Sequence, residues 1–148
     1  MEIILSDVYA PEVIKLFSEQ DDVMIRFLGK DSIYYTRYSS DENIEAVWLA
    51  YEDNLPTGCI AYRVKAQGTG EIKRLFVTEN YRGLGLSKAL ILTVQEHAKA
   101  KGNHILHLST RITLEPAVSI YRRFGFCETF RKGLYIEMEK NLCPTKLQ

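Results

Sequence analysis

The chain alternates between short apolar runs and polar turns over most of its 148 residues. Residues 2–6 form one such run, and residues 46–51 and 57–65 form two more, each with the length of a β-strand. Asn54 and Pro56 lie between the last two runs, where they favour a turn. The pattern therefore predicts an N-terminal strand followed by a β-hairpin.

Two stretches have the spacing of amphipathic helices. Apolar positions recur at helical intervals over residues 11–20, and residues 23–28 could extend this helix until Gly29. A second helix is predicted after residue 85, where four apolar residues recur at intervals of four and define one buried face. These four residues are Leu86, Leu90, Val94 and Ala98. Gly102 supplies a C-terminal stop.

A strand, a helix and a strand follow one another in the second half of the chain. Residues 67–70 favour a turn, and a strand at residues 71–77 follows, whose apolar run Leu75-Phe76-Val77 suits burial. The second helix separates this run from another at residues 104–109. This order predicts a parallel crossover, in which the turn before the helix lies at the carboxyl end of the first strand.

One more helix and two strands are predicted in the last third of the chain. Thr113 is placed to cap a helix that tolerates Pro116 in its first turn and ends at Gly125. Residues 126–130 begin a strand, and residues 135–139 alternate as the final one.

Composition supports a single globular domain over residues 1–148. The chain is 46% hydrophobic, and its 19 basic residues balance 19 acidic residues, so its formal net charge is zero. We expect no nucleic-acid partner, because such proteins usually carry a basic excess or patch. The N-terminus has no basic region before an apolar run, and no apolar stretch is long enough to cross a bilayer, so we expect neither a signal peptide nor a membrane partner.

The three cysteines, Cys59, Cys127 and Cys143, are far apart and form no C-x-x-C motif. Their number and spacing predict neither a disulfide framework nor a zinc site. We therefore expect a cytoplasmic protein that needs no metal. The sequence leaves open whether it forms a homodimer.

An aromatic cluster of Tyr34, Tyr35 and Tyr38 precedes the polar stretch at residues 39–43. The tyrosines could line a substrate pocket, although amphipathic packing explains most such clusters. The acidic side chains of the polar stretch could attract a cationic amine, but a solvated loop is the simpler interpretation.

The sequence Arg-Gly-Leu-Gly-Leu-Ser at residues 82–87 lies between a predicted strand and a predicted helix. Unpaired N–H groups and the helix dipole favour phosphate at such a position. Gly83 and Gly85 remove side chains where a phosphate would approach the backbone. A Walker A loop is excluded because Lys88 follows Ser87 instead of a glycine, and the dinucleotide fingerprint fails because Lys88 occupies its third glycine position. We infer a pyrophosphate cradle.

The motif Arg82-x-x-Gly85-x-Ser87 resembles the acetyl-CoA loop of the GNAT superfamily of N-acetyltransferases, Gln/Arg-x-x-Gly-x-Gly/Ala. Ser87 departs from the last position of that loop but is still small. The resemblance extends to a second GNAT signature, Asn-x-x-Ala-x-x-Leu-Tyr-x-x-x-Gly-Phe. Its matching residues here are Ala117, Ile120, Tyr121, Gly125 and Phe126. Leu114 stands where the family has asparagine, so a cofactor contact by that side chain is lost.

The resemblance implies an α+β fold with a mixed, mostly antiparallel sheet of about six to seven strands flanked by helices. In such a fold, the strands at residues 71–77 and 104–109 splay apart, and acetyl-CoA, the implied co-substrate, lies between them. The backbone of Leu75, Phe76 and Val77 would pair with its pantetheine amides. Its pyrophosphate would be held by the cradle residues Arg82, Gly83, Leu84, Gly85, Leu86 and Ser87.

The chemistry that the resemblance implies is acetyl transfer from the thioester to a primary amine, and we expect the amine to belong to a small molecule. A protonated amine is no nucleophile, so its proton must be removed. Glu71 is the candidate base, because some family members place a glutamate there; a strand-end ion pair is the alternative interpretation. Tyr121 is the candidate acid, which would protonate the departing CoA thiolate. His104 and His107 are further possible bases, but a histidine in a strand is more often structural.

Two alternatives to a small-molecule acetyltransferase stay open. The same scaffold could acetylate a protein lysine or N-terminus. It could also be a non-catalytic acyl-CoA-binding module, although the presence of both Tyr121 and the cradle argues against this.

Overall fold

The computed structural model describes residues 1–31 and 40–143. The strands are β1 (Glu2–Ser6), β2 (Ala46–Glu52), β3 (Leu55–Ala66), β4 (Thr69–Val77), β5 (Ile105–Arg111), β6 (Cys127–Lys132) and β7 (Tyr135–Asn141). The helices are α1 (Pro11–Leu28), α3 (Leu86–Ala100) and α4 (Glu115–Arg123), with short 3₁₀ helices η1 (Gly29–Asp31) and η2 (Glu79–Tyr81). The predicted aromatic cluster at Tyr34, Tyr35 and Tyr38 lies outside the described residues.

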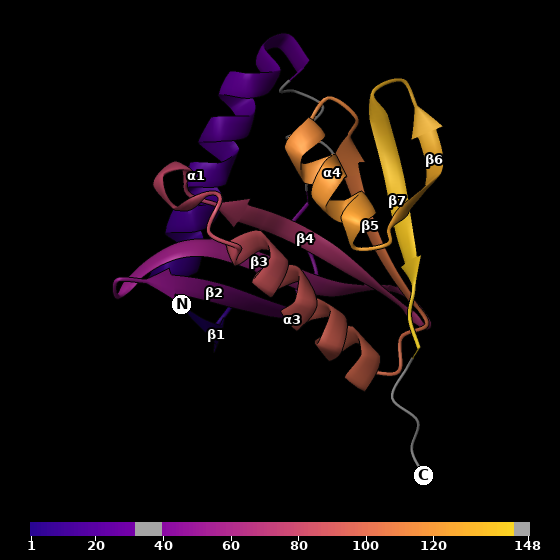
Figure 1. Cartoon of the computed structure of the whole chain (residues 1–148), viewed down its shortest axis with the longest axis horizontal. Coiled ribbons are helices and arrows are strands. Elements are labelled where there is room, and N and C mark those ends of the chain that lie inside the picture. Colours follow the sequence, from indigo (N-terminus) through magenta and orange to yellow (C-terminus); the bar gives the residue numbers. More distant parts are fainter. Residues whose placement is uncertain (32–39, 144–148) are drawn as a thin grey trace. The chain divides into compact units, whose positions relative to one another are not determined.

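The strands form one sheet in the order β1-β2-β3-β4-β5-β7-β6 (Figure 1). β4 and β5 are parallel, whereas β1 with β2, β2 with β3, β5 with β7, and β6 with β7 are antiparallel. The sheet is therefore mixed, and seven strands with helices confirm the predicted α+β class. The parallel crossover β4-α3-β5 is confirmed as well.

The chain divides into two compact units. The first comprises Met1–Arg63 and Lys73–Ile91, and the second comprises Val64–Ile72 and the chain from Leu92 onward. β3, β4 and α3 each pass from one unit into the other along the chain. That residues 1–148 act as one domain stays a prediction.

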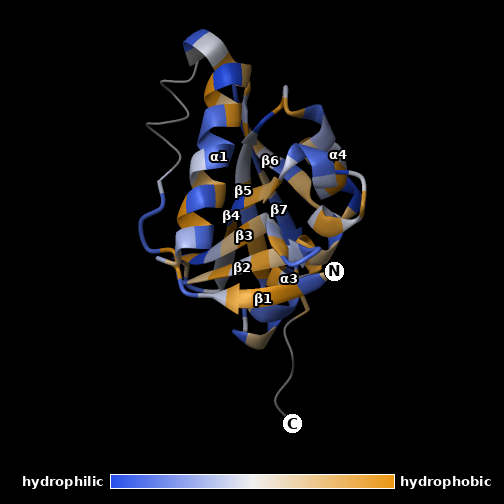
Figure 2. Ribbon diagram, turned by 90° about the vertical axis from the view of Figure 1, so that its left-hand side faces the viewer, coloured by the Kyte–Doolittle hydropathy of each residue, from blue (hydrophilic) through white to orange (hydrophobic). Residues whose placement is uncertain are grey.

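In the first unit, α1 packs an apolar stripe into a hydrophobic core. Figure 2 shows hydrophobic and hydrophilic residues alternating along this helix, as its amphipathic sequence requires. Val13 and Leu16 are buried in a cluster with Val47, Leu49, Cys59, Ala61 and Phe76. The helix runs through the second apolar patch to Leu28 and ends at Gly29, whose φ is +56°. Both the predicted extension and its stop are confirmed.

The β2–β3 hairpin has a tighter turn than the sequence predicts. Its two loop residues, Asp53 and Asn54, have φ angles of +52° and +64°, as a type I′ turn requires. Pro56 belongs to β3, where it is paired with Tyr51 at a register irregularity. The prediction that Pro56 marks the turn is wrong. A bulge accommodates proline within a strand, because a bulge leaves a residue outside the regular hydrogen-bond ladder.

Arg74 anchors the polar stretch before β2 to β4. It is one of four residues other than glycine with a positive φ, at +58°, among the described residues. Its guanidinium donates two hydrogen bonds of 2.8 Å to the carboxylate of Asp41 and also pairs with Asp21. The guanidinium carbon lies 4.6 Å from the centre of the Phe17 ring. Asp41 is therefore held by an ion pair, which the prediction of a solvated loop did not include.

In the second unit, β5 and β7 separate an apolar from a polar face. Leu106, Leu108, Ile136 and Met138 are fully buried. The residues that alternate with them, His107 on β5 and Glu137 and Glu139 on β7, share the opposite face. β4 joins this part of the sheet through three parallel pairs, from Thr69 with Ile105 to Glu71 with His107. Thr69 and Gly70 thus belong to the strand and not, as predicted, to the turn.

The helices of the second half end largely as predicted. The four predicted core positions of α3, from Leu86 to Ala98, are almost completely buried. Gly125 follows α4 with a φ of +91°, which confirms it as the helix stop. The prediction that Thr113 caps this helix is wrong: α4 begins at Glu115, so Leu114 occupies the N-cap position without a side-chain hydrogen bond.

The cysteines are unpaired, with Cys59 buried and Cys127 and Cys143 exposed. Within the described residues, none of the helices combines the length and apolar character needed to span a bilayer. In residues 1–31 and 40–143, no group of three or more His, Cys, Asp and Glu side chains is arranged to hold a metal ion.

Candidate active site

A glycine turn leads from β4 into α3 (Figure 1). Gly83 and Gly85 have φ angles of +80° and +83°, which residues with a side chain rarely adopt. A Cβ at either glycine would meet no atom within 4 Å, so the space in front of this backbone is open. The turn can therefore admit a ligand close to its main chain.

The first turn of α3 supplies amide donors directly after the glycines. The amide of Ala89 bonds to the carbonyl of Gly85 at 3.1 Å and so begins the intrahelical ladder. Helix geometry leaves the earlier amides, those of Leu86 to Lys88, without an intrahelical acceptor. Together with the dipole of a 15-residue helix, these donors suit a phosphate group.

Arg82 braces the turn against the end of β4. Its Nε donates a hydrogen bond of 3.0 Å to the carbonyl of Val77. Its guanidinium carbon lies 5.9 Å from the centre of the Phe76 ring. Arg82 therefore holds the turn in place against β4. Its other guanidinium N–H groups can donate to a ligand phosphate.

The carbonyls at the end of β4 already have partners on one side. The carbonyl of Leu75 accepts a 3.0 Å hydrogen bond from Gln20, and that of Val77 accepts the bond from Arg82. A Cβ on Gly58 would lie 3.1 Å from the carbonyl oxygen of Phe76, so a side chain at this position of β3 would crowd that carbonyl. Each carbonyl can accept a second hydrogen bond. The predicted pairing with pantetheine therefore requires either such second bonds or an exchange of partners.

Glu71 is buried beside His107, its register partner on β5. The distance from Glu71 Oε2 to His107 Nε2 is 3.6 Å, and the distance to Lys65 Nζ is 4.0 Å. Both distances exceed a hydrogen bond of good geometry. Glu71 is thus placed in a low-dielectric environment between two basic groups.

His107 is surrounded by carboxylates from two strands. Its Nδ1 forms a 3.1 Å hydrogen bond with Glu139 Oε2, and its Nε2 lies 3.1 Å from Glu137 Oε1. The second contact is close but not aligned, because Nε2 is buried and has no hydrogen-bond partner. The same polar face carries a 3.0 Å hydrogen bond between Ser109 and Tyr135.

Tyr121 lies on α4 with its side chain buried. Its ring meets that of Phe126 edge to face, with centres 5.9 Å apart and planes at 64°. Burial raises the pKa of its phenol above the ordinary value. The hydroxyl therefore stays protonated at neutral pH and can only donate a hydrogen bond to an anion.

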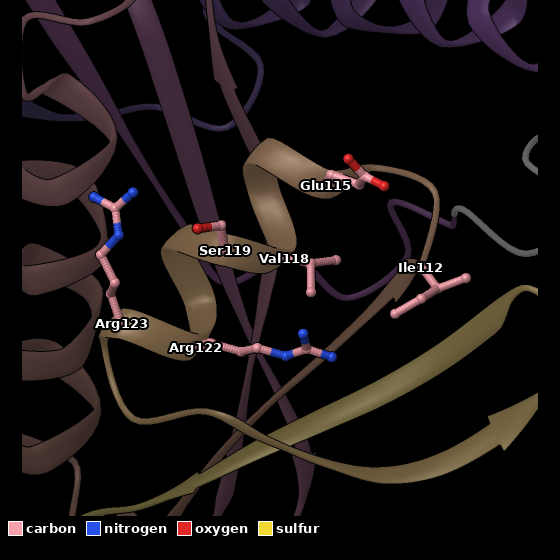
Figure 3. Close-up of a pocket in the computed structure, with 6 residues that line it drawn as sticks. All are labelled: Ile112, Glu115, Val118, Ser119, Arg122 and Arg123. Carbon is pink, nitrogen blue, oxygen red and sulfur yellow. The ribbon is translucent and has the colours of Figure 1, made fainter.

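A hollow of about 680 Å³ lies against α4 (Figure 3). It is lined by Ile112, Glu115, Val118, Ser119, Arg122 and Arg123. No residue predicted for the site lines it. In Figure 3, the guanidinium groups of Arg122 and Arg123 point away from each other, so they do not converge on a single anion.

The family model described as the acetyltransferase (GNAT) family matches residues 11–126 of this chain. The chain belongs to the GNAT acetyltransferase family. An uncharacterised N-acetyltransferase of Dictyostelium discoideum is 43% identical over 58 residues, which cover 39% of this chain and 27% of that protein. Over four curated relatives, the matched part covers 27% to 58% of the relative's length.

Solved GNAT-like structures share the whole fold. A candidate acyl-CoA N-acyltransferase from Klebsiella pneumoniae superposes with a TM-score of 0.78 at 22% identity, covering 96% of this chain and 97% of that one. The PaiA N-acetyltransferase from Thermoplasma acidophilum, solved with coenzyme A, gives 0.65 at 19% identity and covers 95% and 99%. These likenesses confirm a GNAT fold.

Sequence reasoning missed part of the polar face in this GNAT chain. Glu137 and Glu139, which contact His107, were not singled out, although their alternation in β7 already put them on one face. The sequence did not reveal which strand β7 would pair with. His104, the other histidine considered, donates its backbone N–H to Gly68 and accepts from Leu142 at the edge of β5.

Proposed function

We propose that the chain transfers an acetyl group from acetyl-CoA to a primary amine of a small molecule. The observation that carries this proposal is the turn at residues 82–87, where two left-handed glycines leave open space before the N-terminus of α3. Family membership supports acetyl-CoA as the ligand of this turn, and so does the coenzyme A held by the Thermoplasma protein.

The backbone amides from Gly83 to Ser87 would hold the pyrophosphate. No side chain stands before the two glycines, and the helix dipole adds attraction for negative charge. Arg82 fixes the turn and contributes positive charge beside it. When bound, acetyl-CoA supplies the acetyl group as a thioester.

Glu71 is the proposed base. An unperturbed amine has a pKa near ~10.4, so at neutral pH its proton must be removed before it can attack. Glu71 is buried, and its carboxylate has the lone pairs to accept that proton. The ammonium group of Lys65 lies 4.0 Å from this carboxylate and compensates its charge.

Tyr121 is the proposed donor to the departing sulfur. A thiol has an ordinary pKa of about 8.5, and burial raises the pKa of the Tyr121 phenol, so complete proton transfer from phenol to thiolate is uphill. The hydroxyl therefore acts chiefly by donating a hydrogen bond to the thiolate as negative charge develops. Such preorganised donors are effective in a buried site.

Electrostatics favour a cationic acceptor. Three carboxylates, those of Glu71, Glu137 and Glu139, lie on one face of adjacent strands around a single histidine. Such a face attracts an ammonium group before its proton is removed.

A screen of acceptors tests the proposed function. Release of free CoA thiol is followed with linear diamines, amino acids and lysine-containing peptides, each against a blank that measures hydrolysis. We expect amine-dependent release with at least one small amine. Release with peptides alone would favour the protein acetyltransferase, and binding of acetyl-CoA without release by any amine would favour the non-catalytic module.

A further inference from the structure

The proposed base has little contact with water. The Glu71 side chain is only 4% exposed. A base that takes a proton from each acceptor amine must return that proton to solvent before the next turnover. Lys65 Nζ is 4.0 Å away, but an ammonium group has no lone pair and cannot accept a proton. His107, whose Nε2 lies 3.6 Å from the Glu71 carboxylate, is a neighbour that can accept it.

His107 lies between Glu71 and two carboxylates that reach the surface. The imidazole is 2% exposed, whereas the side chains of Glu137 and Glu139 are 22% and 32% exposed. Register fixes this order, because Glu71 pairs with His107 across β4 and β5, and His107 pairs with Glu139 across β5 and β7. The ring thus separates a buried carboxylate from water-accessible ones.

The two ring nitrogens have different surroundings. Nδ1 is 3.1 Å from Glu139 Oε2 in a hydrogen bond, and an ionised carboxylate only accepts, so Nδ1 carries the hydrogen. In the neutral ring, Nε2 then has a lone pair. This atom is buried without an aligned partner, 3.1 Å from Glu137 and 3.6 Å from Glu71.

We propose that His107 carries the acceptor's proton from Glu71 to Glu137, a role that rests on the acetyl transfer proposed above. The amine N–H bond breaks as an O–H bond forms on Glu71. That O–H bond breaks as His107 Nε2 takes the proton, and the new Nε2–H bond breaks as Glu137 takes it in turn. Glu137 passes the proton to water. One proton moves at each step, and no oxidant or reductant is needed.

The proton leaves the ring through Nε2, the same nitrogen that received it, so the ring returns to its starting state. Nδ1–H keeps its bond to Glu139 throughout, so Glu139 orients the ring and Glu137 receives the proton. The transfer from Glu71 requires its oxygen to approach Nε2 by about half an ångström, to hydrogen-bond distance. Among the described residues, the carboxylates of Glu71, Glu137 and Glu139 lie at the ring, Lys65 lies 4.0 Å from Glu71, and Tyr135 is bonded to Ser109 on the same face.

The first test is the protonation state of His107, which needs no enzymatic activity. Nitrogen NMR of the whole chain labelled with ¹⁵N-histidine, followed across pH, should show that the neutral ring carries its hydrogen on Nδ1 and has a bare Nε2. A neutral ring with its hydrogen on Nε2 would overturn the proposal. This measurement can be made even if no acceptor amine is found. The wrong tautomer would overturn the relay alone, whereas failure of acetyl transfer would overturn the proposed function and the relay with it.

The second test is chemical rescue of His107→Ala. Turnover should fall by about tenfold or more, but by less than when the base itself is removed. The affinity for acetyl-CoA should be unchanged. Added imidazole should restore turnover, and pyrazole, a ring of the same size with a far less basic nitrogen, should not. Equal rescue by both rings would show that His107 only fills space, and would overturn the relay.

Glu137→Gln covers the case in which His107→Ala does not fold. The side chain of Glu137 is partly exposed, so its amide should be tolerated. The solvent deuterium isotope effect on kcat should increase, because proton exit becomes slower. Ser109→Ala, on the same face, is the matched control and should leave the isotope effect at the wild-type value. An unchanged isotope effect in Glu137→Gln would contradict the route.

Discussion

Gly85 and Gly102 flank α3 with nearly equal φ angles of +83° and +82°. At neither position would a Cβ meet an atom within 4 Å. Any residue with a side chain therefore carries a similar left-handed strain at both positions, about 1–2 kcal/mol. Only Gly85 belongs to the proposed cradle, so this pair separates an effect on the ligand from an effect on the backbone.

Gly85→Asp should weaken acetyl-CoA binding at least tenfold, which corresponds to about 1.4 kcal/mol. The new side chain would occupy the open space before the turn, and its negative charge would repel the pyrophosphate. Isothermal calorimetry measures the affinity, and thermal unfolding measures the strain. Gly102→Asp should show a similar loss of stability with wild-type affinity. Equal affinities in the two folded variants would place the ligand elsewhere.

Glu71→Gln should reduce kcat most at low pH and recover partly as pH rises. The amide cannot take a proton, but solution supplies more neutral amine as the pH approaches the amine's pKa, ordinarily near ~10.4. The pH–rate profile from pH 6 to pH 9.5 measures the change. Glu128→Gln is a control, because this exposed glutamate pairs only with Arg131 among the contacts of the described residues. A Glu71→Gln profile parallel to that of the wild type would exclude Glu71 as the base.

Tyr121→Phe should lower kcat by about 10²–10³-fold, the usual effect of losing one preorganised hydrogen-bond donor, and leave acetyl-CoA affinity unchanged. The ring and its contact with Phe126 are kept, so folding at neutral pH should be little affected. Tyr135→Phe, which loses a hydroxyl bonded to Ser109, is the matched control. A near-normal kcat in Tyr121→Phe would make Tyr121 a packing residue.

Tyr121→Phe should also change how the stability of the fold depends on pH above neutrality. Burial raises the pKa of the folded Tyr121 phenol, so its stabilising effect is fully present below the unfolded pKa of about 10 and is lost as pH rises through the folded value. Above pH 10, the wild type should therefore lose stability more steeply than Tyr121→Phe, as measured by urea unfolding. Identical slopes would contradict the burial of this hydroxyl.

Arg74→Lys should destabilise the fold by about 1–3 kcal/mol, because an ammonium group cannot reproduce the paired hydrogen bonds to Asp41 or the stacking on Phe17. Urea unfolding measures the loss. In a double-mutant cycle with Asp41→Asn, the two effects should be strongly non-additive. Additive effects would mean that the ion pair contributes nothing measurable.

The local pattern of hydrophobic and polar residues predicted most of the helices and strands. The four-residue spacing from Leu86 to Ala98 predicted α3, and the glycine before it and the glycine after it marked its ends. The errors at Pro56 and Thr113 concern single residues at boundaries. At Pro56, a register irregularity accommodated a residue that propensity excludes from strands.

The contacts that organise the polar face could not be predicted from local pattern. His107 and Glu139 are 32 residues apart, and they meet only because β7 lies next to β5 in the sheet. The ion pair of Arg74 with Asp41 spans 33 residues for a similar reason. Histidines in strands are usually structural, and only the three carboxylates around this one single it out.

Product analysis with carbonyl-labelled acetyl-CoA shows where the acetyl group goes. The chain is incubated with [¹³C]acetyl-CoA and an amine from the acceptor screen, and the labelled carbon is followed by NMR. The account predicts that the label appears as an amide carbonyl, in proportion to the CoA released and dependent on chain, amine and Tyr121. Label found only as acetate, or left in acetyl-CoA while the chain binds it, would contradict acetyl transfer to an amine.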